Sequence, residues 1–353
     1  MTDESMDDLI GRSVERLLRE KRTADRTLAA EPAGMDAETW QELVALGLVG
    51  PDSAGLSERE VVSVTRAIGH AGALVPYADC EGLSRWLAVA AGIETQPSEL
   101  LGLLILDDAG PVSQDRSGNL RIATDGLRLP WGRFSRRTLL AFRWQGLPRV
   151  GMVPTADLRL DPTVNMAGEP LDRCTAPDVV PDGVTGVDEA HGPTALRQRA
   201  ALLRSAAMLG AMQRIHEMTV AYAGDRRQFG RSLSQFQVIQ AYLAEMTAEL
   251  AATQAMLECC LLDPSDGPDA AAPDGAEVAA LRIRAGLAAQ RVATLGHQIH
   301  GAIGFTREYP LHLWSRRLWS WREEHGNDRW WRTRLGRQMI GSGAQAWRTR
   351  ITG

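Results

Sequence analysis

The side chains best suited to bind a phosphorylated cofactor are concentrated between positions 222 and 246, where the sequence reads YAGDRRQFGRSLSQFQVIQAYLAEM. A guanidinium such as that of Arg226 can clamp a pyrophosphate with two hydrogen bonds, and Gln228 follows the arginine pair directly. The ring of Phe229 offers a stacking surface to a purine or a flavin, and Gly230 permits a sharp reversal between two helices. On composition alone, a helix–loop–helix with solvated arginines is the simpler explanation.

A second group lies between positions 296 and 313, GHQIHGAIGFTREYPLHL, which contains Gln298, Gly301 and Gly304. Small residues next to an amide side chain allow a ligand to approach the backbone closely. His300 has no second ligand-type residue at i+4, so a buried, hydrogen-bonded histidine explains it better than a metal ligand does. The chain also lacks GxSxG, HExxH, paired CxxC and a GxGxxG that follows a strand. We therefore predict neither a hydrolytic triad nor a metal site.

Long helices must position both groups, because apolar residues recur at helical spacing from Pro193 onward and also between positions 7 and 86. Between about 100 and 185, short apolar runs separated by Gly, Pro, Asp and Asn are typical of strands. The proline-rich stretch 261–277 predicts a loop between two helices, the second of which runs from about 278 to 299.

The predicted fold is therefore mostly α with a small β domain. The expected parts are an N-terminal α-helical domain over residues 1–98, a small β domain over residues 99–190 and a C-terminal helical bundle over residues 191–353.

Composition limits the possible classes of function. The chain has 353 residues, 44% of them apolar, and a formal net charge of −5, so no basic field would attract nucleic acid. No stretch approaches the roughly 20 apolar residues of a membrane span, and the acidic N-terminus does not look like a secretory signal. The four cysteines, Cys80, Cys174, Cys259 and Cys260, lack metal-ligand spacing. We expect a cytoplasmic protein with reduced thiols that binds neither nucleic acid nor membranes.

Six of the ten tryptophans are near the C-terminus and are interspersed with arginines: Trp314, Trp319, Trp321, Trp330, Trp331 and Trp347. Aromatic residues at this density are common where helices pack at a subunit interface. We expect such an interface here, and ordinary surface amphipathicity is the alternative.

Taken together, these segments resemble the acyl-CoA dehydrogenase superfamily. The C-terminal bundle of that family carries an R-x-Q-F-G-x-x-x-x-x-F-Q motif, which residues 226–237 match. It also carries a later Q-x-x-G-G-x-G-F motif, which residues 298–305 match as QIHGAIGF except for Ala302 in place of the second glycine. Residues 47–78 resemble the helical run near the family's N-terminus, so the likeness covers most of the chain in order.

The resemblance implies that the C-terminal part is a four-helix bundle, that the protein is a dimer or tetramer, and that FAD lies between subunits. It implies that Arg226, Gln228 and Phe229 bind the ADP part of FAD and that Gln298, Gly301 and Gly304 meet the cofactor of a neighbouring subunit. Phe236 and Gln237 are secondary candidates for cofactor contacts.

The implied reaction is α,β-dehydrogenation of an acyl-CoA thioester, in which a carboxylate removes the α-proton while the β-hydride passes to the flavin. An electron-transfer flavoprotein is the implied acceptor. The family's usual base lies in a C-terminal E-G-T loop, and this chain has EEHGND at 323–328. Aligning on Gly326 puts His325 in the glutamate position, so Glu324, one residue away, is the candidate base. A solvated acidic turn that caps the next helix is an equally simple explanation.

Other features depart from the family pattern. The T-E-P-x-x-G-S-D flavin loop is missing from residues 100–120, and the β domain is shortened, so its flavin contacts are either lost or supplied by a partner chain. An alternative base on the helix before Arg226 is nearly excluded, because residues 190–216 contain no Asp or Glu and Glu217 comes only toward the far end of that helix. Residues 278–307 contain no carboxylate either.

A short chain of this kind resembles the subunits of heteromeric acyl-CoA dehydrogenases of actinobacteria, which act on steroid side chains as α2β2 assemblies. We therefore expect an FAD-dependent acyl-CoA dehydrogenase subunit that works in a hetero-oligomer with a second member of the family, which can supply the base. Two alternatives stay open: a self-sufficient homo-oligomer that uses Glu324, and a flavin-free scaffold for a catalytic relative. The identity of the acyl group also stays open.

Overall fold

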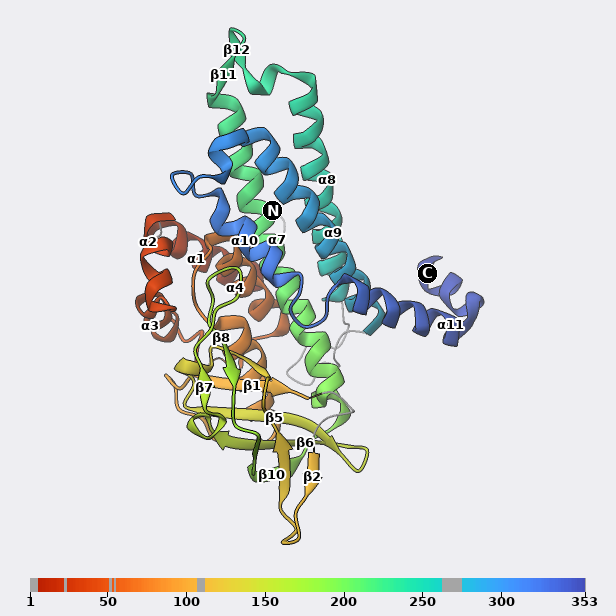
Figure 1. The fold of residues 1–353 in the computed structure, drawn as a ribbon. Coiled ribbons are helices and arrows are strands. Elements are labelled where there is room, and N and C mark those ends of the chain that lie inside the picture. The colour runs from red at the N-terminus through yellow and green to blue at the C-terminus, as the bar shows by residue number, and fades with distance from the viewer. Residues whose placement is uncertain are drawn as a thin grey trace.

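The computed structural model describes residues 6–21, 24–50, 53, 55–106, 112–261 and 275–352. Helices come first along the chain, a β-rich segment follows, and helices return (Figure 1). This order confirms the predicted fold class, mostly α with a small β domain. Most of the predicted loop at 261–277 lies outside the described residues.

The N-terminal part consists of helices that pack against the later bundle. They are α1 (Met6–Lys21), α2 (Ala24–Ala30), α3 (Ala37–Ala45), α4 (Glu58–Ala71), α5 (Tyr77–Asp79), a π-helical turn (Cys80–Arg85) and α6 (Trp86–Ala90). A capping box starts α4, because the Ser57 hydroxyl accepts from the Glu60 N–H and the Glu60 carboxylate accepts from the Ser57 N–H. Gly72 ends that helix with a φ of 64°.

The β-rich segment contains three small sheets. Its strands are β1 (Leu101–Ile105), β2 (Val112–Gln114), β3 (Leu120–Ala123), β4 (Arg128–Pro130), β5 (Arg137–Trp144), β6 (Leu147–Pro154), β7 (Leu160–Asp161), β8 (Leu171–Cys174), β9 (Asp178–Val179) and β10 (Asp182–Gly186). The main sheet has the order β1-β5-β6-β10, in which β1 and β5 are parallel and the other pairs are antiparallel. The sheets β2-β3-β9 and β4-β8-β7 are antiparallel.

Strand β5 joins two hydrophobic cores, which explains its continuous apolar sequence. Leu139 and Ala141 face the core shared with the helices, whereas Leu140 and Phe142 face the core of the β-rich segment. Alternate side chains of a strand point to opposite faces, so a strand buried on both faces needs apolar residues at every position. Its contacts therefore seat the β-rich segment on the helices.

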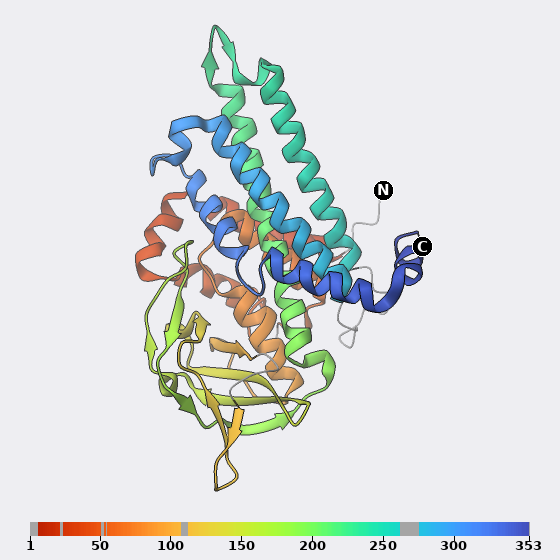
Figure 2. The same cartoon turned by 45° about the vertical axis from the view of Figure 1, so that its right-hand side comes forward.

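The C-terminal part is built around α7 (Pro193–Asp225), α8 (Gln237–Cys260) and α9 (Gly275–His300), which run side by side (Figure 2). A hairpin of β11 (Arg227–Gln228) and β12 (Arg231–Ser232) connects α7 to α8. The β-rich segment lies at the start of α7 and this hairpin lies at its opposite end (Figure 1). Helix α10 (Leu311–Trp321) crosses the bundle, and α11 (Asp328–Thr352) projects away from it (Figure 2).

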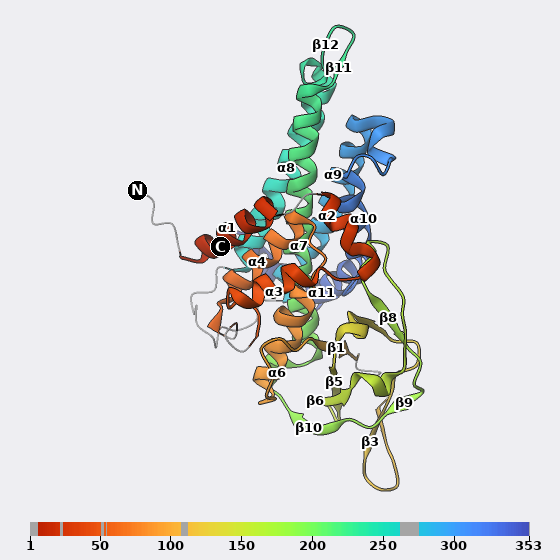
Figure 3. The same ribbon diagram turned by 90° about the vertical axis from the view of Figure 1, so that its left-hand side faces the viewer.

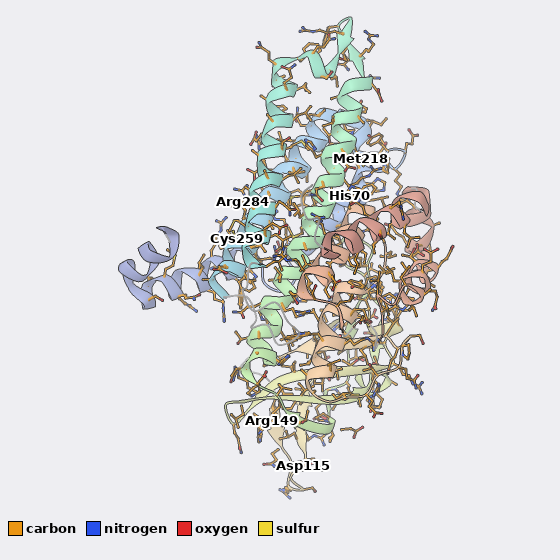
Figure 4. All side chains as sticks on the ribbon, turned by 180° about the vertical axis from the view of Figure 1, so that it is seen from behind. His70, Asp115, Arg149, Met218, Cys259 and Arg284 are labelled. Atoms are coloured by element: carbon orange, nitrogen blue, oxygen red, sulfur yellow. The ribbon has the colours of Figure 1, made fainter. Side chains whose placement is uncertain are left out.

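Helix α4 packs against α7, so the N-terminal helices and the bundle share one core. Figure 3 shows these helices above the β-rich segment. Seen from behind, Asp115 marks the outer end of the β2–β3 hairpin, and His70 and Met218 lie among the helices (Figure 4).

The tryptophan-rich stretch is in large part core of this chain. Trp314, Trp321 and Trp331 are at most 4% exposed. The prediction that this stretch forms a subunit interface is therefore wrong for these three residues, because their own chain covers them. Trp319 and Trp330 are half-buried and pack against the same core.

Among the helices that the structure describes, none is both long enough and apolar enough to span a bilayer.

Candidate active site

A cavity of about 320 Å³ lies where the β-rich segment meets the helices. Its apolar wall comes from β1, including Leu101 and Leu104, and from Leu127, which directly precedes β4. Its polar wall has contributions from every part of the chain: Asp79 from α5, Asn165 and Glu169 from the loop before β8, Arg204 from α7, and Glu324 and His325 from the turn after α10. Apolar walls with a few convergent polar groups are typical of small-molecule sites.

A buried arginine on α9 holds the turn that carries Glu324. Arg282, which is 0% exposed, donates from Nη2 to the carbonyl oxygens of Trp321, Arg322 and Glu324 at 2.7, 2.9 and 3.2 Å. Trp321 is the last residue of α10 and the other two residues belong to the turn, so the guanidinium ties the end of the helix to the turn. Burial lowers the pKa of Arg282 to about 10, although the nearby Asp328 and Glu324 carboxylates oppose this shift.

The other side of the turn is held by Trp331, whose indole Nε1 donates to the His325 carbonyl oxygen at 3.2 Å. His325 and Gly326 both have positive φ values, 53° and 97°. Glycine tolerates that conformation without strain, which explains the glycine at the second of these two positions.

Glu324 is held by three side chains. Its Oε2 pairs with Arg204 Nη2 at 3.0 Å, and its Oε1 accepts from Asn165 Nδ2 at 3.0 Å and from Ser320 Oγ at 3.2 Å. The side chain of Glu324 is 19% exposed. The carboxylate is therefore oriented and still reaches the cavity.

Arg204 also pairs with Asp79, with Nη2 at 3.3 Å from both carboxylate oxygens. Burial alone would raise the pKa of Asp79, but Arg204 and hydrogen bonds from His325 and Trp131 outweigh it and lower that pKa to about 2. Burial would likewise lower the pKa of Arg204, yet the carboxylates of Glu324, Asp79 and Glu169 raise it. This guanidinium stays charged and neutralises acids from separate segments.

Glu169 is a second carboxylate at the cavity, 7% exposed. Its Oε2 accepts from Trp321 Nε1 at 2.9 Å and from Asn165 Nδ2 at 3.0 Å. Burial, together with the charge of Glu324, raises the pKa of Glu169, against the opposing effect of Arg317 and Arg204.

The two other residues that the sequence analysis considered for the position of the base have different partners. His325, which the alignment put in the glutamate position, also lines the cavity, with Nε2 at 3.8 Å from Asp79 Oδ1. Glu217 pairs instead with His70 Nε2 at 3.0 Å, on the face of α7 toward α4, and is not among the residues that line the cavity.

The predicted ADP-binding residues lie at the opposite end of α7, on the β11–β12 hairpin. Arg226, Gln228 and Phe229 are exposed, and the Phe229 ring is 90% exposed. Phe229 and Gly230 turn the hairpin with φ values of 51° and 80°. The Phe236 ring is half-buried and lies 6.4 Å from the Phe229 ring.

The second predicted group lies nearby, at the end of α9 and in the 3-10 turn that follows it (Gly301–Phe305). Gln298 and Gly301 are exposed, Gly301 has a φ of 65°, and Gly304 is buried against His300. The His300 ring stacks on Tyr222 of α7, with ring centroids 4.4 Å apart, so the two groups belong to the same end of the bundle.

The chemistry of this end fits the ADP half of FAD. It offers exposed guanidinium groups for a pyrophosphate, an exposed ring for stacking, and open backbone at Gly230 and Gly301, where an added Cβ would meet nothing within 4 Å. About six helical turns, or about 33 Å, separate Arg226 from Arg204 along α7. The hairpin and the cavity of one chain are therefore separate places.

Sequence reasoning missed Asp79, Asn165, Glu169, Arg204 and Arg282. One signal was available for Arg204, which is the lone charge in the apolar run AALLRSAAMLGA, residues 200–211. A single charge on a buried helix face needs a partner. Within the described part of the chain, no three His, Cys, Asp or Glu side chains are grouped so that they could hold a metal ion.

Comparison with known proteins points to one family. Residues 196–340 match the family model described as acyl-CoA dehydrogenase, C-terminal domain. The acyl-CoA dehydrogenase IpdE2 of Mycobacterium tuberculosis is 28% identical over 307 residues, which cover 83% of this chain and 84% of that protein.

Solved structures share the fold. The ChsE4-ChsE5 complex from Mycobacterium tuberculosis contains a chain with a TM-score of 0.84 and 21% identity, covering 96% of this chain and 99% of that one. A variant of the Tcur3481-Tcur3483 steroid ACAD has a TM-score of 0.81 and 22% identity, covering 95% and 98%.

Proposed function

Because this chain belongs to the acyl-CoA dehydrogenase superfamily, we propose that it is a subunit of an FAD-dependent acyl-CoA dehydrogenase with Glu324 as the catalytic base. The observation that carries the proposal is the position of the Glu324 carboxylate. It lines a cavity between an apolar strand wall and a buried arginine. A general base must lie within hydrogen-bond reach of the proton that it removes, and Glu324 faces the space where an acyl chain would lie.

The roles of the chain's own residues follow from their contacts. Glu324 takes the α-proton of the thioester, and the electron pair of that C–H bond forms the Cα–Cβ double bond as hydride leaves Cβ. Arg204 and Ser320 hold the carboxylate, so its orientation does not have to be found during the reaction. The leucines of β1 exclude water from the acyl chain. FAD, when bound, supplies the hydride acceptor.

The assembly that we propose is a hetero-oligomer. Within one chain the candidate ADP-binding residues are about 33 Å from Arg204, which supports the idea that they serve the site of another subunit. The similar structures are a ChsE4-ChsE5 complex and a Tcur3481-Tcur3483 steroid ACAD, each named for a pair of proteins. A homo-oligomer that uses Glu324 is the second candidate, because the position of Glu324 in the cavity fits either assembly. A flavin-free scaffold is the third.

By analogy with the steroid ACAD, the proposed substrate is a steroid-derived acyl-CoA thioester. We propose an electron-transfer flavoprotein as the acceptor of the electrons.

The proposal is tested first by the visible absorption spectrum and native mass of the chain, expressed alone and then together with a second family member. A hetero-oligomeric enzyme would contain flavin and be bleached by acyl-CoA only in the co-expressed form. A flavin-containing homo-oligomer that acyl-CoA bleaches would establish the second candidate. Absence of flavin and of turnover in every form would contradict both.

The role of Glu324 is tested by Glu324→Gln in the active form. We expect kcat to fall by about 100- to 10,000-fold with flavin content unchanged, because an amide of the same shape cannot accept the α-proton. The matched control is Glu94→Gln, an exposed residue after α6 that does not line the cavity, which should keep normal turnover. Unchanged turnover in Glu324→Gln would move the base to the partner chain.

A further inference from the structure

Asn165 has a fixed orientation in the loop between β7 and β8. Its Oδ1 accepts from the backbone N–H groups of Ala167 and Glu169 at 2.9 and 3.0 Å. This is an Asx-type turn, in which the side-chain oxygen is committed to the backbone. Because the oxygen is taken, the amide nitrogen must point the other way, toward the cavity.

The amide nitrogen joins two carboxylates from different parts of the chain. Nδ2 is 3.0 Å from Glu169 Oε2 and 3.0 Å from Glu324 Oε1. An NH2 group has two hydrogens, so it can donate one to each acid and is then fully used. Glu169 lies in the β-rich segment with Asn165, whereas Glu324 is 159 positions away, in the turn after α10.

Glu169 anchors this bridge. Its Oε2 also accepts from the Trp321 indole at 2.9 Å, and the buried Arg317 has Nε 3.6 Å from its Oε1. These contacts fix the acid against the end of α10. The Asn165 amide, held by its own turn and by Glu169, is a rigid donor for Glu324.

We propose that Asn165 is a positioning residue for the base: its amide links Glu169 to Glu324 and so sets the direction of the Glu324 carboxylate from the β-rich segment. The inference rests on the proposed function, since it takes Glu324 as the base. Arg204 and Ser320 hold Glu324 from the helices, and Asn165 holds it from the β-rich segment.

The sharpest test is Asn165→Asp. The introduced carboxylate keeps the oxygen that accepts from Ala167 and Glu169, so the turn is preserved, but it replaces the donor with an oxygen that faces two acids. We expect kcat at pH 7 to fall about 10- to 100-fold, with KM for acyl-CoA little changed, since a misdirected base is costly. The acidic limb of the kcat–pH profile should move to higher pH, because the new charge disfavours ionisation of its neighbours.

A second readout does not depend on turnover. The introduced carboxylate would hold its proton more tightly in the folded chain than in the unfolded chain. The melting temperature of Asn165→Asp should therefore fall further below that of the parent as pH rises from about 4 to 8. Asn165→Ser removes the bridge without adding charge, so it should lower kcat without moving the acidic limb. Asn119→Asp, in the exposed β2–β3 turn, is the matched control and should change neither kcat nor the pH profile.

The outcomes separate this inference from the proposed function. If Glu324→Gln abolishes turnover while Asn165→Asp keeps the parent's kcat, pH profile and melting behaviour, the inference alone is overturned. If Glu324→Gln keeps turnover, Glu324 is not the base. The proposed role and the positioning inference then both fail, and a pH-dependent melting difference would report only a structural bridge.

Discussion

Arg204 is a single buried guanidinium that contacts Asp79 from the N-terminal helices and Glu324 from the turn after α10. A buried ion pair adds little stability compared with a well-packed apolar pair, but removing one partner is costly. Arg204 has two carboxylate partners, so the loss of one leaves it partly neutralised.

Asp79→Asn should lower the free energy of unfolding by about 2 kcal/mol at pH 7. The folded-state pKa of Asp79, about 2, is below its ordinary value of 3.8. The Asp79 carboxylate therefore stabilises the folded chain fully above its pKa in the unfolded chain. This stabilisation is lost as pH falls through its pKa in the folded chain. At pH 3 the difference between parent and variant should be about half as large.

Urea unfolding of the parent and of Asp79→Asn at pH 7 and at pH 3 measures this difference in the free energy of unfolding. The control is Asp157→Asn, an exposed residue, which should stay within about 0.5 kcal/mol of the parent. Equal losses for Asp79→Asn at pH 7 and pH 3 would contradict the assigned pKa shift.

At the scale of elements, α4 and α7 approach each other closely where two glycines meet. A Cβ added at Gly210 would lie 2.7 Å from the His70 backbone nitrogen, and one added at Gly69 would lie 2.9 Å from the Ala207 Cα. Real Cβ atoms do not come this close, so the crossing requires glycine on both helices. Since Arg204 is on α7, this crossing also sets where the guanidinium meets Asp79.

Gly210→Ala should lower the free energy of unfolding by about 1–3 kcal/mol, because the added methyl forces the helices apart. Alanine is the better helix former, so a loss has the opposite sign to that expected from propensity. Gly224→Ala, on the same helix with nothing within 4 Å of its added Cβ, is the matched control and should be neutral or slightly stabilising. Denaturant unfolding would refute the packing argument if both variants gained stability.

At the scale of the molecule, the β-rich segment, which borders the cavity, and the β11–β12 hairpin lie at opposite ends of α7 (Figure 1). The hairpin end is rich in exposed arginine and aromatic side chains that the chain's own core does not use. A surface of this kind can bind cofactor or partner without any effect on the fold.

Arg226→Ala should therefore reduce flavin retention while leaving the fold intact. We expect the affinity for FAD to fall about 10- to 100-fold through lost hydrogen bonds to the pyrophosphate. The thermal stability of the flavin-free chain should hardly change, since the guanidinium is exposed. Flavin content by absorbance measures the first effect, with Arg116→Ala on the distant β2–β3 hairpin as the control. Normal flavin content in Arg226→Ala would count against the assignment of this hairpin.

The sequence by itself determined the order of helices, strands and helices, because apolar periodicity is a local property that each segment carries alone. The resemblance also pointed to Glu324, because the sequence EEHGND at 323–328 lies where the family has its E-G-T loop. The motif at 226–237 was equally readable, since its residues are neighbours in the chain.

Only the tertiary structure decided the partners of the Glu324 carboxylate. Asn165 is 159 positions from Glu324, and Asp79 is 125 positions from Arg204. A hydrogen bond needs its donor and acceptor within about 3 Å and correctly aimed. That geometry depends on how the β-rich segment, α5, α7 and the turn after α10 pack together. No single segment contains this information, so the polar wall of the cavity exists only once the cores have formed.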